Sequence, residues 1–277
     1  MAEAEFWAGD MGKEWARRAD AMDRQLAPAG AAGLAALAAR SGECILDLGC
    51  GSGATTAELC RAVGPDGAVT GVDISPDQVA AARVRPGNEH AGFMVCDAGT
   101  WPFEAGSYDA LFSRFGCMFF NDPPAAFANL RRALKPGGRA VLTVWHDLKR
   151  NPWAAIPARV GAEALGPAEP PAPGTPGPFA WADPMTFQPI LEGAGFSGLE
   201  WTEQPILMRI GEVGPEAPVE RAVAMMLRIG VLARRLKGMP PETRTMVAER
   251  LAPELEAFVH DGWVTMPGLI WVIRARA

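Results

Sequence analysis

Five short apolar segments alternate with helical stretches between residues 44 and 145 of this 277-residue chain. Strands are predicted at 44–48, 68–73, 92–96, 108–113 and 139–145. Residues typical of helix ends lie between these strands. Ser75-Pro76 is typical of a helix start, and the run KPGG at 135–138 is typical of a helix end. This alternation is typical of a parallel sheet covered by helices, so we expect a doubly wound α/β fold.

The segments on either side of this region predict a lid and a cap. The expected divisions are an N-terminal helical lid at 1–40 and a ligand-binding core at 41–150. The remainder is expected to complete the sheet at about 183–211 and 262–277, and to add a helical cap at about 151–182 and 212–261.

A glycine-rich loop follows the first predicted strand. Gly49, Gly51 and Gly53 lack Cβ atoms, so the backbone can turn sharply and approach a ligand closely. In open parallel sheets, ligands bind at the carboxyl ends of the strands. Asp73 ends the second strand, 20 residues after Gly53, and Asp97 ends the third. Their carboxylates are placed to accept ribose hydroxyls and an adenine amine, and the Ala98 N–H to reach a ring nitrogen.

Asp47 bears on which nucleotide the loop binds. A pyrophosphate would be repelled by a carboxylate two residues before the first glycine, and the loop reads GxGxG rather than GxGxxG. No GK[ST] follows, which excludes a P-loop. S-adenosylmethionine (SAM) has no phosphate and carries an ammonium and a sulfonium, which nearby carboxylates attract. A satisfied structural role for Asp47 is the alternative.

The motifs DLGCGSG, VTGVDIS, VCDAGTWPF, YDALFSRFG and LKPGGRAVLTVW resemble, in order, those of class I SAM-dependent methyltransferases. The likeness is greatest to the group related to ubiquinone and menaquinone C-methylation. It covers about residues 45–145 and is highly specific in order and spacing. It implies a seven-stranded, mostly parallel Rossmann-like sheet, with strands six and seven at 199–210 and 268–276 and the last strand antiparallel.

The resemblance also implies which residues contact SAM. The set is Asp47, Gly49, Gly51, Gly53, Asp73, Ile74, Asp97 and Ala98, with Ile74 packed on the adenine. Ser113, after the fourth strand, is expected to contact the methionine end. Its neighbour Arg114 is expected either to bind an acidic substrate or to pair with an aspartate of the core.

His146 is the only histidine expected at the mouth of the sheet, which makes it the candidate general base. A loop histidine bonded to backbone is the alternative. Trp7, Trp15 and Trp153 are expected to close over the cofactor, where aromatic faces attract a sulfonium. Met226 lies in the amphipathic run 219–237, which predicts either an apolar pocket with an anion site or a packed helix with a solvated basic face.

Composition limits the other functional classes. The formal net charge of -6 disfavours nucleic acid as a partner, and no apolar run is long enough to span a membrane. Five cysteines without a CxxC, and no HxxH, predict neither disulfides nor a metal site. We therefore expect a cytoplasmic enzyme that acts alone or as a homodimer.

The sequence as a whole predicts a SAM-dependent methyltransferase that releases S-adenosylhomocysteine (SAH). The predicted acceptor is a small apolar or aromatic molecule, methylated on carbon or oxygen. Two alternatives come from other classes. One is a SAM-binding protein, or a SAM-using enzyme, that transfers no methyl group, and the other is an NAD(P)-dependent oxidoreductase.

Overall fold

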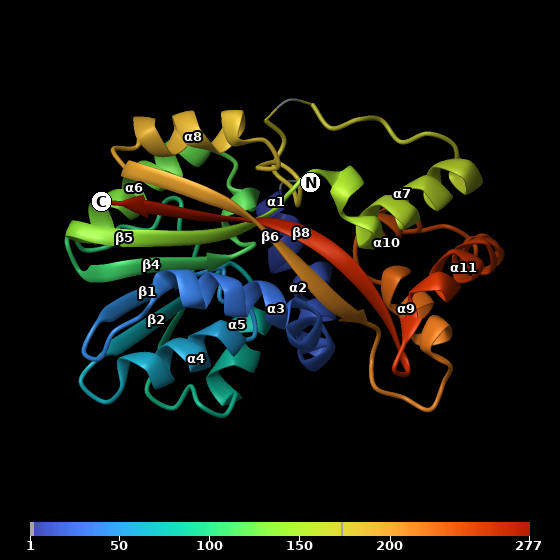
Figure 1. The fold of residues 1–277 in the computed structure, drawn as a ribbon, viewed down its shortest axis with the longest axis horizontal. Helices are drawn as coiled ribbons and strands as arrows, with labels where there is room; N and C mark the ends of the chain where they lie inside the picture. Colours follow the sequence, from blue (N-terminus) through green and yellow to red (C-terminus); the bar gives the residue numbers. More distant parts are fainter. Residues whose placement is uncertain (1–2, 173) are drawn as a thin grey trace.

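The computed structural model describes residues 3–172 and 174–277, and a mixed sheet runs through it (Figure 1). The hydrogen-bonded strand order is β3-β2-β1-β4-β5-β8-β6, and a two-residue strand, β7, pairs with β8. The strands are β1 (Cys44–Leu48), β2 (Ala68–Asp73), β3 (Gly92–Val95), β4 (Tyr108–Arg114), β5 (Leu134–Trp145), β6 (Ser197–Ile210), β7 (Val259–His260) and β8 (Trp263–Arg276). Strands β1 to β5 are parallel, and β8 is antiparallel to β5, β6 and β7. The doubly wound, mostly parallel sheet expected from the sequence is confirmed.

The central strands are apolar along nearly their whole length because helices cover them. Ile45 of β1 pairs with Val69 of β2 on one side and with Ala110 of β4 on the other, and all three side chains are buried. Such runs are typical of parallel strands that are covered on both faces. One charged residue, Asp47, interrupts the apolar run of β1.

Helices between the strands cover the sheet. They are α4 (Ala54–Val63), α5 (Pro76–Val84), α6 (Pro123–Ala133) and α8 (Pro184–Gly193). Three of them begin with proline, whose missing N–H is not needed in a first turn. Asp122 and Asp183 cap two of these starts by accepting backbone N–H bonds. Local sequence thus determines where these helices begin.

The N-terminal segment forms three helices, α1 (Glu3–Ala8), α2 (Asp10–Arg17) and α3 (Ala19–Leu37). Helix α3 contacts β4, β5, β6 and β8, while α2 contacts α5. A Cβ on Gly12 would lie 2.2 Å from the Ser75 hydroxyl and 2.2 Å from the Trp7 carbonyl oxygen. Glycine therefore lets α2 lie directly against the start of α5.

A second group of helices lies beyond the sheet, at the right of Figure 1, joined to it by the long strands β6 and β8. It contains α7 (Pro152–Leu165), α9 (Pro218–Met226), α10 (Val231–Arg235) and α11 (Pro241–Leu255). Leu232, Leu236, Val247 and Leu251 are buried within it. Short 3-10 turns occur at Cys117–Phe119, Leu148–Arg150 and Glu256–Phe258.

Some boundaries differ from those expected. Strand β5 begins at Leu134 rather than at 139, because Leu134 already pairs with Tyr108 and the register shifts before Ala110. The region 216–260 forms three helices, separated at Gly230 and Gly238, which both have positive φ. None of the helices in the described part of the chain is long and apolar enough to cross a bilayer.

We expect Gly33→Ala to destabilise the fold, because a Cβ there would lie 2.7 Å from Thr143 Cγ2 and 2.9 Å from Phe112 Cε2. Overpacking of this kind costs about 1–3 kcal/mol of unfolding free energy, which chemical denaturation would measure. Gly193→Ala, in α8, is the matched control, since open space surrounds its Cβ position. It should instead stabilise the fold by ~0.5 kcal/mol or more through helix propensity. Equal effects of the two substitutions would contradict this account of α3.

Candidate active site

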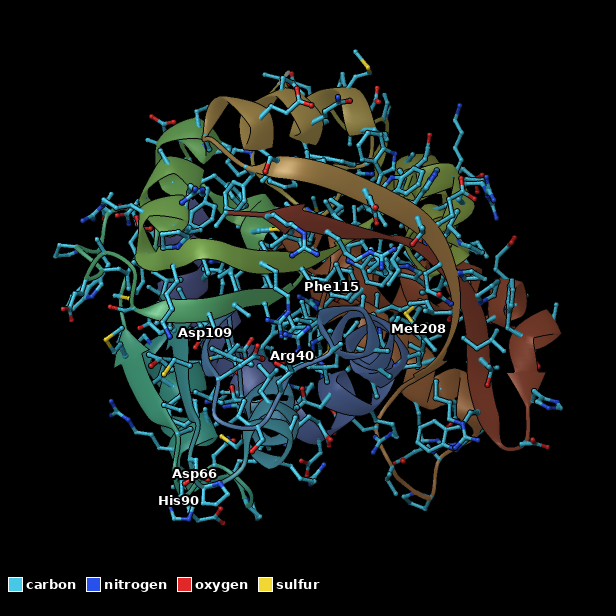
Figure 2. All side chains as sticks on the ribbon, turned by 60° about the vertical axis from the view of Figure 1, so that its left-hand side comes forward. Arg40, Asp66, His90, Asp109, Phe115 and Met208 are labelled. Carbon is cyan, nitrogen blue, oxygen red and sulfur yellow. The ribbon has the colours of Figure 1, made fainter. Side chains whose placement is uncertain are left out.

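A cavity of about 700 Å³ opens at the carboxyl ends of the parallel strands. Its wall comes from the loops after β1 to β5, from the N-terminal helices, and from α7, α9 and α10. Figure 2 shows the direction of β4, with Asp109 near its start and Phe115 just beyond its end, toward the middle of the molecule. Phe115 lines the cavity, so the cavity lies where ligands bind in open parallel sheets.

The glycine loop forms one wall of the cavity. Gly49 and Gly51 line it, with φ of 65° and 56° that favour glycine. A Cβ on Gly49 would lie 2.7 Å from the Cα of Gly116, so the loops after β1 and β4 touch here. Gly53 lies behind the wall, where it precedes α4 and a Cβ would lie 2.4 Å from Asn88 Nδ2. The three glycines therefore have different roles.

Asp73 is fixed beside this loop by two backbone donors. Its carboxylate oxygens accept 2.9 Å hydrogen bonds from the N–H groups of Gly51 and Ser75. Burial raises the pKa of Asp73, although these N–H groups act in the opposite direction. A carboxylate oxygen accepts more than one bond, so a carboxylate held in this way remains able to accept ligand hydroxyls.

The third strand contributes the next part of the wall. Ile74, Asp97 and Ala98 all line the cavity. Asp97 Oδ1 accepts a 2.9 Å bond from Gly99 N–H, and the Ala98 carbonyl oxygen accepts one from Asn129. The chain after β3 is therefore held in a turn at the cavity edge. Asp73, Ile74, Asp97 and Ala98 lie together, as expected from their places at strand ends.

Asp47 does not line the cavity. The sequence predicts instead that its carboxylate faces the ligand. Its Oδ2 accepts bonds from the hydroxyls of Thr55 (2.9 Å) and Thr56 (2.7 Å) at the start of α4, and its Oδ1 is buried without a partner. Burial raises the pKa of Asp47 to about 6, more than the threonine bonds lower it. Its side chain points toward α4 rather than toward the edge of the sheet.

Ser113 and His146 also lie outside the cavity wall. The Ser113 hydroxyl is buried and donates to the Leu48 carbonyl oxygen at 2.9 Å, which ties β4 to β1. His146 Nε2 lies 3.3 Å from Glu203 Oε1, and its ring lies 4.5 Å from that of Trp271. Its Nδ1 accepts the N–H of Asp147. The His146 side chain therefore packs against residues of β6 and β8 rather than facing the cavity, so the base prediction has no support here.

Aromatic and methionine side chains form the rest of the wall, from the N-terminal helices and the cap. Trp7 lies at ring distances of 5.3 Å from Trp15 and 5.1 Å from Phe119. Trp153 lies 4.5 Å from Trp145, and Met226 faces the same cavity. The predicted lid residues Trp7, Trp15, Trp153 and Met226 are thus brought together around one space.

Phe115 is a cavity residue that the sequence did not reveal. Its φ of 63° is unusual for a residue with a side chain. The ring stacks on Trp145 at 4.2 Å with an interplanar angle of 6°. This stacking, together with burial, offsets the backbone strain of about 1 kcal/mol or more.

Arg114 lines the cavity and is paired, the second of the two roles predicted for it. Its Nη2 lies 3.0 Å from Oδ1 of Asp23 on α3. Asp23 also pairs with Arg85 and accepts the Ser52 hydroxyl at 2.7 Å. Arg85 Nε in turn donates to the Ser52 carbonyl oxygen at 2.6 Å. The cluster joins the N-terminal helices to both the glycine loop and the end of β4.

Residues 45–138 match the family model of the methyltransferase domain. The nocamycin O-methyltransferase of Saccharothrix syringae is 29% identical over 238 residues, covering 82% of each chain. The 2-phytyl-1,4-naphtoquinone methyltransferase of Nostoc punctiforme is 34% identical over 113 residues, which cover 39% of this chain and 49% of that protein. The chain contains a class I SAM-dependent methyltransferase domain.

A solved structure shares the fold of this methyltransferase. The YcgJ protein from Bacillus subtilis aligns over 89% of this chain and 97% of its own, with a TM-score of 0.57 and 15% identity. SAM is the methyl donor of the domain and SAH its product. When bound, the donor supplies a methyl group on a positively charged sulfur.

The side chains of the cavity fit SAM. The Gln78 side-chain oxygen is buried without a partner in the cavity wall, 3.8 Å from the Cβ position of Gly51. An ammonium or hydroxyl of the ligand would satisfy this acceptor. Asp73 and Asp97 add carboxylates nearby, and the Trp7 indole N–H is a buried donor without a partner. Within residues 3–172 and 174–277, no cluster of three acidic, histidine or cysteine side chains suits a metal ion.

We expect the stability of the methyltransferase to depend on the ionisation of Asp47. Its pKa is about 6 when folded against an ordinary 3.8, so the folded chain holds the extra proton between these pH values. Stability from this group is therefore lost as pH rises from 4 to 7. Asp47→Asn should remove a cost of about 2–3 kcal/mol at pH 7, seen as unfolding free energy that falls less with pH than in the wild type.

Asp109→Asn provides the control of opposite sign. The pKa of Asp109 is lowered despite partial burial, because Lys135 and the Cys44 N–H donate to its carboxylate. This substitution should cost stability at pH 7 and progressively less as pH falls below 4. If Asp47→Asn and Asp109→Asn gave parallel pH profiles, the assignment for Asp47 would be wrong.

Proposed function

We propose that this methyltransferase transfers the methyl group of SAM to carbon or oxygen of a small apolar or aromatic molecule. The observation that carries the proposal is the composition of the cavity beyond the glycine loop. That region is lined by Phe6, Trp7, Trp15, Phe115, Trp145, Trp153, Phe179, Met225 and Met226. Burial of an apolar ring against such a wall contributes about 25 cal/mol per Å² of area removed from water.

The strand order supports a division of the cavity into two halves. Strands β3, β2, β1 and β4 are successive neighbours, so the loops after them follow one another along the edge. Asp97 and Ala98 would hold the adenine, Asp73 the ribose, and Gly49 and Gly51 the methionine part, with Ile74 on the adenine face. The loops after β4 and β5 would then face the methyl group, and we call that part the acceptor half.

The relatives support the same acceptor class. One is named for an O-methylation and the other for a naphthoquinone with an apolar side chain. Within this proposal α1 and α2 act as the lid and α7, α9 and α10 as the acceptor cap. Positioning of the acceptor and exclusion of water by these helices would contribute most of the acceleration.

We expect Asp73→Asn to weaken SAH binding by about tenfold or more, since hydrogen bonds to a charged group contribute ~1.5–3 kcal/mol. Isothermal titration calorimetry would measure the dissociation constant. Asp66→Asn is the control, because Asp66 is exposed and precedes β2 at the end opposite to Asp73, at the lower edge of Figure 2. Unchanged affinity in Asp73→Asn would show that the ribose lies elsewhere.

Methyl transfer itself is tested by SAH production with a panel of aromatic hydroxyl compounds and quinones. Trp153→Ala should raise the acceptor KM about tenfold or more, as loss of a buried indole does, while leaving the SAM dissociation constant within about twofold. Trp201→Ala, which removes an indole packed on Phe187 outside the cavity wall, is the control. SAM binding without SAH release from any acceptor would favour a SAM-binding protein, and tight binding of NADH would favour an oxidoreductase.

A further inference from the structure

Two buried glutamines line the cavity, and their side-chain amides have no hydrogen-bond partner. Gln25 of α3 is 6% exposed and Gln78 of α5 is 5% exposed. Neither amide bonds to any residue that the structure describes, whereas the buried amides of Asn88 and Asn151 bond to backbone carbonyl oxygens. Buried amides are normally hydrogen-bonded, so each glutamine is suited to bind a group that enters the cavity.

Gln78 belongs to the cofactor half. Its side-chain oxygen lies 3.8 Å from the Cβ position of Gly51, and the N–H of Gly51 donates to Asp73. SAM would therefore provide the partner of Gln78 in the function proposed above. Gln25 needs a different explanation, because it comes from another helix.

Helix α3 places Gln25 beside the acceptor half. A Cβ on Gly33 would lie 2.7 Å from Thr143 Cγ2 of β5, and a Cβ on Gly30 would lie 3.5 Å from Arg114 Cδ at the end of β4. Toward its N-terminus, α3 thus follows these strands to their carboxyl ends, and Gln25 lies more than one turn beyond Gly30. The sheet contacts of α3 are mainly with β4, β5, β6 and β8, and the loops after β4 and β5 form the acceptor half.

The Gln25 side chain points away from the glycine loop. Asp23, two residues earlier on α3, bonds to Ser52 of that loop and to Arg114. Side chains two residues apart on an α-helix point about 200° apart, because one turn holds 3.6 residues. Gln25 is therefore directed toward the side of β6 and the cap, where Ile210 and Met226 also line the cavity.

The charged side chains of this part of the wall already have partners. Arg114 pairs with Asp23 at 3.0 Å. Arg234 is likewise partnered, and its guanidinium lies 3.9 Å from the centre of the Phe6 ring. A ligand beside Gln25 therefore needs no charge of its own to balance the wall.

The remaining polar groups lie nearer to the cofactor or to the solvent. Asn121 and Asp122 are exposed, and they follow Phe120, whose Cδ1 lies 3.2 Å from the Cβ position of Gly99 in the loop after β3. The buried Trp7 N–H belongs with the groups that fit SAM. Gln25 is thus the buried, uncharged polar side chain that distinguishes the acceptor half.

We propose that the methyl acceptor carries an uncharged oxygen group, a hydroxyl or a carbonyl, on its apolar body, and that Gln25 binds this group. The inference rests on the function proposed above and adds one feature to its substrate. A primary amide both donates and accepts hydrogen bonds, so it can bind either kind of oxygen. Gln25 is a specificity-determining residue and takes no part in proton transfer.

The same amide selects against ligands that lack such a group. Water that enters the free cavity can satisfy Gln25. A wholly apolar ligand would displace this water and leave the amide unpaired, which lowers its affinity. A buried polar group that loses its partner discriminates between ligands more strongly than a small difference in apolar shape does. The aromatic wall thus favours an apolar body only when it carries the oxygen group.

Binding to the SAH complex tests this preference without turnover. The probes are 1-naphthol against its isostere 1-methylnaphthalene, and 1-tetralone against tetralin. By calorimetry at pH 7.5, we expect at least one oxygen-bearing probe to bind about fivefold or more tighter than its apolar partner, although transfer from water alone favours the apolar one. The naphthol pair reports on a hydroxyl and the tetralone pair on a carbonyl. Oxygen-bearing probes that bind no tighter than their partners would overturn the proposal.

Substitution of each glutamine assigns the preference to one residue. Gln25→Met keeps an unbranched side chain without the amide, and it should abolish or reverse the preference while leaving the SAH dissociation constant within about twofold. That unchanged constant also shows that the variant is folded. Gln78→Met should do the opposite, weakening SAH about fivefold and leaving the preference of the saturated complex intact. Gln204→Met, on β6 outside the cavity wall, is the control.

The other outcomes separate this inference from the proposed function. Weaker SAH binding in Gln25→Met would place Gln25 with the cofactor and overturn the inference, as would a preference that survives the substitution. Tighter binding of 1-naphthoate than of 1-naphthol would show that the group is charged, and would overturn it too. SAH release from aromatic acceptors would still uphold the proposed function in these cases, whereas absence of SAM binding would contradict both.

Discussion

The backbone of Gly49 lies so close to that of Gly116 that a side chain on either would collide with the other loop. This contact joins the loop after β1 to the loop after β4. In the function proposed above, one of these loops would face the cofactor and the other the methyl acceptor. The two loops meet without an intervening side chain, so the two ligands would lie next to each other here. The rest of the site is arranged around this junction.

The Asp23 cluster connects α3 to both of the segments that meet at this contact, the glycine loop and the end of β4. Asp23 belongs to α3, Arg85 follows α5, and Arg114 ends β4. These three elements are far apart in the chain, and the cluster is only partly exposed, so its ion pairs are screened less than surface pairs. The N-terminal helices are thereby tied to the ligand-binding edge rather than to a distant part of the sheet. One carboxylate of α3 therefore contacts both the glycine loop, through Ser52, and the end of β4, through Arg114.

The sequence predicted those features of the fold that depend on residues close together in the chain. The strands were recognisable because parallel strands are apolar along their length, and Asp73 and Asp97 because a strand end fixes their place at the edge of the sheet. The predicted direction of the Asp47 side chain differs from the structure, because spacing along the chain does not show which way a carboxylate points. Its partners Thr55 and Thr56 belong to the following helix.

His146 and Asp23 show the second limit of sequence reasoning. His146 follows β5 as expected, but its partners Glu203 and Trp271 come from strands that join the sheet much later in the chain. Asp23 carries no motif, and its importance comes only from the arginines that the fold brings to it. Phe115 likewise becomes notable through its backbone conformation and its stacking on Trp145. Each depends on tertiary contacts that periodicity does not encode.

Strands β6 and β8 continue far beyond the parallel part of the sheet and carry much of the cap at their far ends (Figure 1). Ile210, the last residue of β6, pairs with Val264 at the start of β8. The segment between these two residues therefore leaves β6 and returns to β8 at adjacent points, as an inserted segment would. The strands that end at the glycine loop do not depend on this excursion for their pairing, although the excursion supplies Met225 and Met226 to the cavity wall. One cavity is thus walled by two parts of the chain that are built independently of each other.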